Sequence, residues 1–267
     1  IAAVSEREDP SELLLIHKNA VDEKQKFSLR QNAVVGTSSA RRKSQLLAWR
    51  PDVKPEDLRG NVPTRIQKLR DKKYDAILIA NAGVSRLQLD LSELYCEKLD
   101  PREFIPAPAQ GVLALQIREP SSALPKAERN RDQNLLDILQ KINNKEVAET
   151  IAVERRILNL FDGGCQLPLG VLCQQDENED AETIFKVRVA KADTWNKFPT
   201  YFYFESKKTD GLAEKIVAKI NAGIIPSLPV AIRMENLGLR RAEATVFISR
   251  DEKKNDSQRR KITRTAC

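Results

Sequence analysis

Five arginines stand at positions where an α/β fold could bring them to one cleft. Each guanidinium is a permanently charged fork that binds carboxylate or phosphate oxygens in pairs. Several such groups together indicate a small ligand that carries several carboxylates or phosphates. The five residues are Arg41, Arg42, Arg59, Arg65 and Arg86.

The first two arginines follow a turn that is itself suited to anions. The sequence predicts a short buried strand over 32–36, a Gly-Thr-Ser-Ser turn and a helix that ends before Pro51. N–H groups and hydroxyls at a helix N-terminus bind anions, which makes Thr37 and Ser39 candidate ligands. A serine N-cap followed by exposed arginines would give the same pattern, and this segment alone leaves both interpretations open.

The other three arginines follow the same plan. Arg59 and Arg65 flank a Gly60 turn and a helix that runs to about Lys72, and Arg86 lies beyond a continuous apolar strand over 74–80. Alternating strands and helices predict an α/β domain, in which ligands bind beyond the C-terminal ends of the strands.

Cys165 lies in a loop whose backbone is tightly specified. Two glycines precede it and Pro168 follows, so its thiol would be presented from a defined turn after a helix. Such a thiol could carry a covalent group, whereas free cysteines are more often small buried residues. His17 is the only histidine and the four cysteines form no CxxC pair, so we expect no metal site and no histidine-based triad.

Charge and hydropathy bound the partners. Residues 240–267 hold nine Lys/Arg against four Asp/Glu, so this tail accounts for +5 of the net charge of +7. The nearly neutral remainder suits a small anion better than a nucleic acid. Because the sequence shows neither an apolar run long enough for a membrane span nor a leader peptide, we expect a cytoplasmic monomer.

Further elements are predicted along the chain. The N-terminal part should hold a short helix over 11–16 and a proline-stiffened hinge over 104–111, followed by a strand over 112–117. Amphipathic helices are expected over 135–142 and 146–161. Alternating residues over 167–173, 183–190 and 199–206 predict antiparallel strands, with a covering helix over 210–222. A strand over 244–250 precedes a charged tail, predicted to be disordered.

Five motifs, in this order along the chain, resemble the hydroxymethylbilane synthase (porphobilinogen deaminase) family. The resemblance covers roughly residues 1–227, through Gly36–Arg42, Leu58–Arg65, Tyr74–Ala80, Pro108–Gly111 and Gly163–Pro168. It implies two α/β domains like those of periplasmic binding proteins and a small α+β domain. It also implies a dipyrromethane cofactor held by a thioether to Cys165. The family's reaction joins four porphobilinogen molecules into a linear tetrapyrrole, and each molecule loses ammonia.

The resemblance assigns roles and domain limits. Residues 1–26 would be the remnant of the first domain, 27–106 the second, with the arginine-lined cleft, 107–136 the hinge and return to the first, and 137–230 the third. Residues implied to bind the cofactor are Cys165, Thr37, Ser39, Arg41, Arg42, Arg59 and Gly60. Those implied to bind the substrate are Arg65, Arg86 and Gln110.

Two departures from the family pattern leave alternatives open. The family's catalytic aspartate lies in a segment that precedes the stretch matching residues 1–10, so no catalytic residue is assigned in this chain. Either the sequence lacks the front of its first domain, or the protein is a non-catalytic anion-binding module. Residues 231–267 are either a basic tail or the start of a fused uroporphyrinogen-III synthase, which the run Thr245–Arg250 resembles.

Overall fold

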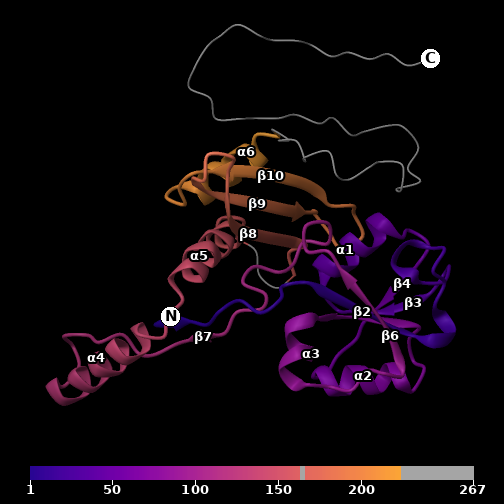
Figure 1. Ribbon diagram of the computed structural model, residues 1–267, viewed down its shortest axis with the longest axis horizontal. Coiled ribbons are helices and arrows are strands. Elements are labelled where there is room, and N and C mark those ends of the chain that lie inside the picture. Colours follow the sequence, from indigo (N-terminus) through magenta and orange to yellow (C-terminus); the bar gives the residue numbers. More distant parts are fainter. Residues whose placement is uncertain (163–165, 224–267) are drawn as a thin grey trace, which may run out of the picture.

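The computed structural model describes residues 1–162 and 166–223 (Figure 1). Within these ranges the chain forms a five-stranded sheet, a three-stranded sheet and a two-stranded ribbon, each with associated helices. The fold is therefore mixed α/β, as predicted. Cys165 and every prediction for 231–267, including the fused domain, lie outside the described residues.

The five-stranded sheet holds most of the predicted arginine cluster. Its strand order is β4-β3-β5-β2-β6, with parallel pairing of β3 to β4 and β5 and antiparallel pairing of β2 to β5 and β6. The strands are β2 (Glu12–His17), β3 (Val34–Gly36), β4 (Lys54–Glu56), β5 (Ala76–Ala80) and β6 (Leu94–Leu99). Short 3-10 helices over Lys18–Ala20 and Lys26–Ser28 follow β2.

Helices cover both faces of this sheet, which explains its continuous apolar strands. On β2, Leu14 and Ile16 pack with the core beside α1 (Ala40–Trp49), whereas Leu13 and Leu15 pack with the core beside α2 (Val62–Arg70) and α3 (Asn81–Leu87). Alternate residues of a strand point to opposite faces, so a strand buried on both sides must be apolar throughout. The prediction of a strand buried on both faces is confirmed for β5.

The prediction of a short helix over 11–16 is wrong. Residues 12–17 form β2, which lies between β5 and β6 at the centre of the sheet. The run Leu13–Ile16 is apolar at every position because it is covered on both faces, and this burial overrides the helix-capping signal of Asp9 and Ser11. Residues 12–17 therefore pack with the unit predicted for 27–106, although they were assigned to the preceding domain.

Local signals at the starts of α1 and α2 agree with the structure. Ser39 caps α1 by accepting a hydrogen bond from the Arg42 N–H at 3.4 Å, and Asn61 caps α2 by accepting one from the Thr64 N–H at 3.0 Å. Small polar N-caps satisfy N–H groups that have no partner within the helix. These caps fix where each arginine-bearing helix begins.

The C-terminal unit has the predicted architecture. Its antiparallel sheet has the order β10-β9-β8, and two helices pack on one apolar face of it. The elements are α5 (Lys145–Leu160), β8 (Leu169–Glu177), β9 (Thr183–Lys191), β10 (Thr200–Ser206) and α6 (Leu212–Asn221). Cys165 belongs to the connection between α5 and β8.

A narrow ribbon and a long helix form the third part. β1 (Ala3–Val4) pairs antiparallel with β7 (Ala114–Leu115), so the strand predicted over 112–117 is shorter than expected. The helix predicted over 135–142 begins earlier and is α4 (Lys126–Gln140). Figure 1 shows α4 and the ribbon extending away from the two larger sheets.

The start of the predicted hinge is held firmly between the two larger units. The Ile105 N–H donates to Gln45 Oε1 at 2.7 Å, and Gln45 Nε2 donates back to the Ile105 carbonyl at 2.9 Å. On the other side the Val171 N–H donates to the Pro106 carbonyl at 3.0 Å. The hinge thus remains a prediction only for residues after Pro106. No helix of residues 1–162 and 166–223 combines the length and apolar content that a membrane span needs.

We predict that Gly170→Ala destabilises the junction. A Cβ at this position would lie 2.6 Å from the Ile105 carbonyl oxygen, and that backbone is fixed by Gln45. Overpacking of this kind costs about 1–3 kcal/mol of unfolding free energy, measurable by urea denaturation. Gly83→Ala is the matched control, because its Cβ would meet only Val62 at 3.5 Å inside α3. An equal loss in both variants would contradict the prediction.

Candidate functional site

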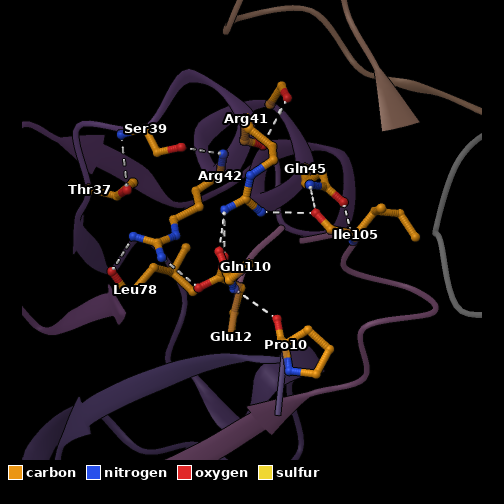
Figure 2. Close-up of polar contacts among 11 residues, drawn as sticks. Pro10, Glu12, Thr37, Ser39, Arg41, Arg42, Gln45, Leu78, Ile105 and Gln110 are labelled. Atoms are coloured by element: carbon orange, nitrogen blue, oxygen red, sulfur yellow. Dashed lines mark hydrogen bonds and ion pairs between the residues drawn. The ribbon is translucent and has the colours of Figure 1, made fainter. Parts of the chain in front are cut away.

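Arg41 and Arg42 converge on one buried carboxylate, as Figure 2 shows. Glu12 Oε1 lies 2.6 Å from Arg41 Nη2, and Glu12 Oε2 lies 2.7 Å from Arg42 Nη2. The Glu12 side chain has no exposed surface, and both arginines are buried. These guanidinium groups are therefore bound within the protein as well as placed at the front of α1.

Glu12 is ionised in this setting. Burial alone would raise the pKa of its carboxyl, but the charges of Arg42 and Arg41 outweigh burial and lower the pKa to about 2. The remaining guanidinium N–H groups find backbone acceptors: Arg41 donates to the Ile105 carbonyl at 2.9 Å and Arg42 to the Leu78 carbonyl at 3.1 Å. The buried Arg42 Nε is left without a hydrogen-bond partner.

Gln110 extends this cluster to the segments that cross toward the ribbon. Its Oε1 accepts a hydrogen bond from Arg41 at 3.4 Å, and its Nε2 donates to the Pro10 carbonyl at 2.8 Å. The Gln110 carbonyl accepts from Arg7 Nε at 3.0 Å. Gln110 thus links the arginine cluster to both crossing segments, and its side chain has protein partners.

A second buried carboxylate continues the network to α5. Glu154 accepts from Arg7 at 2.6 Å and from the N–H groups of Ala109 at 2.6 Å and Cys173 at 2.7 Å. Sequence reasoning missed Glu12, Arg7 and Glu154. A usable signal was present for Glu12, because a single acidic residue beside the apolar run Leu13–Ile16 implies a buried cationic partner.

Thr37 and Ser39 shape the turn before α1. The Thr37 hydroxyl accepts from the Ser39 N–H at 3.3 Å, and Ser39 is the N-cap described above. A Cβ at Gly36 would lie 3.0 Å from both Tyr74 and Ile77, so a small residue is needed here. These hydroxyls take part in the local structure of the turn, which agrees with the N-cap interpretation and leaves the anion role a prediction.

Arg59 and Arg65 lie across the turn at Gly60, whose φ of +119° favours glycine. Arg65 Nε donates to the Gly60 carbonyl at 2.7 Å. Burial and the neighbouring charge of Arg42 lower the pKa of Arg65. The structure therefore brings Arg65 close to Arg42, and Arg59 is exposed beside them.

Arg86 lies apart from these residues, at the end of α3. It is exposed and donates to the Gly111 carbonyl at 2.8 Å. The five predicted arginines thus form two classes. Arg41 and Arg42 are neutralised by Glu12, whereas Arg59, Arg65 and Arg86 have no carboxylate within ion-pair distance among the described residues.

Cavity shape does not mark this cluster. Two surface hollows of about 470 and 220 Å³ lie elsewhere, one on the C-terminal sheet beside Lys191 and one beside Arg7. In residues 1–162 and 166–223, no three His, Cys, Asp or Glu side chains are grouped to hold a metal ion. The site is therefore defined by its unbalanced positive charge, which attracts anions.

Neither cysteine in the described ranges is suited to covalent attachment. Burial raises the pKa of the Cys173 thiol to about 12, and Glu154 raises it further. Burial and Glu93 raise the pKa of the Cys96 thiol as well. The thiolate is the nucleophilic form of cysteine, so both thiols are weak nucleophiles at neutral pH.

Comparisons with known proteins agree with the motifs. Residues 1–126 match the family described as "Porphobilinogen deaminase, dipyromethane cofactor binding domain". Proteins named porphobilinogen deaminase from Oceanobacillus iheyensis and Bacillus subtilis are each 39% identical, over 67% and 72% of this chain. The chain spans only 53% and 60% of their lengths.

One solved structure is also similar, an arginine-specific periplasmic binding protein of Salmonella typhimurium. It has 13% identity and a TM-score of 0.33, and the match covers 55% of this chain and 62% of that one.

We predict that Glu12→Gln costs about 3–5 kcal/mol of unfolding free energy at neutral pH, because two buried guanidinium groups lose their counter-charge. The pKa of Glu12 is lowered in the folded protein, so its contribution is present above pH 4.5 and is lost as the pH falls toward about 2. The stability difference between the two proteins should therefore narrow over that range in denaturant titrations.

Glu93→Gln serves as the control for a surface pair. Glu93 contacts Arg70 at 2.5 Å with both side chains substantially exposed, and such pairs are worth at most about 1 kcal/mol. A loss for Glu12→Gln no larger than this, or one that does not vary with pH, would show that Glu12 does not hold the cluster together.

Proposed function

Residues 1–126 of the chain belong to the porphobilinogen deaminase family, and we propose that the protein acts as a hydroxymethylbilane synthase. In this proposal four porphobilinogen molecules are joined into a linear tetrapyrrole, with loss of one ammonia at each condensation. The growing chain is held by a dipyrromethane cofactor bonded to Cys165. Since the chain spans about half to three-fifths of its relatives, both activity and substrate are proposals.

The observation that carries the proposal is the excess of unpaired guanidinium groups. Each pyrrole of the product bears an acetate and a propionate, so the ligand is a string of carboxylates. Arg59, Arg65 and Arg86 lack acidic partners among the described residues, and Arg65 lies close enough to Arg42 to feel its charge. Bound carboxylates would relieve this repulsion, so the residues present fit a polycarboxylate cofactor.

The two arginine classes would have different roles. Arg59, Arg65 and Arg86 would bind ligand carboxylates directly. Arg41 and Arg42, fixed by Glu12, would present a rigid edge to the cofactor with no reorganisation on binding. The buried N–H of Arg42 Nε is one donor that the protein leaves unsatisfied. Thr37, Ser39, Gly60 and Gln110 are proposed to shape the same site.

The cofactor would supply the free pyrrole position at which the chain grows. The contribution of this chain would be to orient and neutralise carboxylates, which raises the effective concentration of the reacting groups. No proton-transfer residue is proposed here, because the family's aspartate is expected in a segment before the matched stretch. Porphobilinogen would be the partner of a cytoplasmic monomer that does not bind nucleic acid. The alternative is a module that binds such anions without chemistry.

We predict a covalent adduct on the protein. Intact-mass spectrometry of the purified chain should show the added mass of two linked pyrroles, and Cys165→Ser should remove it. Cys96→Ser is the control, since this exposed thiol has a raised pKa and should leave the adduct in place. An unmodified wild-type protein that still binds porphobilinogen would favour the non-catalytic module.

A second prediction concerns porphobilinogen binding. Arg59→Leu and Arg65→Leu should each weaken it by about 10- to 150-fold in isothermal titration calorimetry, since a charged hydrogen bond contributes about 1.5–3 kcal/mol. Arg70→Leu provides the control on the same helix as Arg65, because Arg70 is paired with Glu93. Equal affinity in all three variants would remove these residues from the site.

A further inference from the structure

Large apolar side chains are exposed together on one flank of the molecule. Nine large apolar residues are exposed in the described ranges, and six of them lie on or next to the ribbon and α4. We call this surface the apolar flank; it consists of Ile1, Leu113, Leu115, Leu135, Ile138 and Ile142. Isolated exposed apolar residues are ordinary, but a contiguous group of this size marks a surface that another element covers.

On α4 the exposed apolar residues share one side. Leu135, Ile138 and Ile142 follow at spacings of three and four, with Ile142 just past the helix end, and their exposed fractions are 42%, 58% and 62%. A helical stripe of this kind normally faces a core. Polar contacts hold α4 in place, including ion pairs of Arg118 with Glu128 and Asp132.

The ribbon beside α4 is incomplete as a sheet. β7 pairs with β1, and among the described residues no strand pairs with its other edge. β1 is bordered on its far side by residues 143–144, since the Val4 N–H donates to Asn143 Oδ1 at 2.9 Å and the Asn144 N–H to the Val4 carbonyl at 3.0 Å. A free strand edge accepts a further strand, and two strands alone are marginally stable.

We propose that the apolar flank is the docking surface of an additional α/β polypeptide segment. This segment adds a strand to the free edge of β7 and packs an apolar face against Leu135, Ile138 and Ile142. The result has the layering already seen in the five-stranded sheet, where helices cover apolar strands. This inference rests on the family match but not on the proposed activity.

The relatives identify the occupant. Both strands of the ribbon lie within the matched residues 1–126, so the ribbon is part of the family domain. The chain spans 53% and 60% of two relatives' lengths, so these proteins contain residues with no counterpart here. A segment of that origin supplies both required features, an added strand and an apolar face. A second copy of this chain would present a further exposed flank and no complementary feature.

The test is co-expression of the full chain with the part of the Bacillus subtilis relative that it does not match. Light scattering after size exclusion should show a 1:1 complex, and hydrogen exchange should slow by at least about tenfold in residues 113–115 and 126–142. Because the added segment could fail to fold alone, the same measurement is made on a protein in which it is joined to the chain. Unchanged exchange in both formats would overturn the proposal.

Matched variants separate docking from loss of fold. Ile138→Glu should abolish the complex and the added protection, while the exposed Phe198→Glu on the C-terminal unit should leave both unchanged. Each variant should melt like the wild-type chain, since both side chains are exposed. A wild-type chain that is already a dimer with α4 protected would overturn the proposal in favour of a second copy.

Discussion

Glu12 occupies the end of β2 with no exposed surface, and its two oxygens meet guanidinium groups from the first turn of α1. Two buried cations 2.6 and 2.7 Å from one carboxylate leave one net positive charge rather than two. The front of α1 could not pack against β2 and the Ile105 segment without this counter-charge, because desolvated guanidinium groups repel each other. The same pair of contacts ties the cluster to the sheet, to Gln110 and, through Arg7, to Glu154.

This arrangement divides the arginines by what they are free to do. Positive charge that is neutralised inside the protein gives geometry, and positive charge without a partner gives attraction for a ligand. Arg59, Arg65 and Arg86 belong to the second class. A site of this kind selects for the number and spacing of carboxylates more than for a close-fitting cavity, which agrees with the absence of a hollow at the described cluster.

Sequence patterns predicted those features that depend on short-range chemistry. The Ser39 cap, the buried strand before Asn81 and the three alternating strands of the C-terminal unit all follow from local spacing. Long-range pairing was not accessible in the same way. Glu12 was missed because its partners are 29 and 30 residues away, and β2 was taken for a helix because burial on both faces removes the alternation that identifies a strand. Motifs located the arginines correctly, but which of them are neutralised depends on contacts between distant segments.

The clamp at Ile105 has a mechanical consequence. Gln45 holds this residue through both its amide atoms, and β8 approaches so closely at Gly170 that a methyl group would not fit. The five-stranded sheet and the C-terminal sheet therefore share one stiff joint and cannot be drawn apart without breaking buried hydrogen bonds. Under the proposed function, a polymer anchored after α5 would lengthen by several units beside a wall that does not yield. Room for it would have to come from the opposite side, where the ribbon and α4 are connected to the rest by the crossing segments near Arg7 and Gln110.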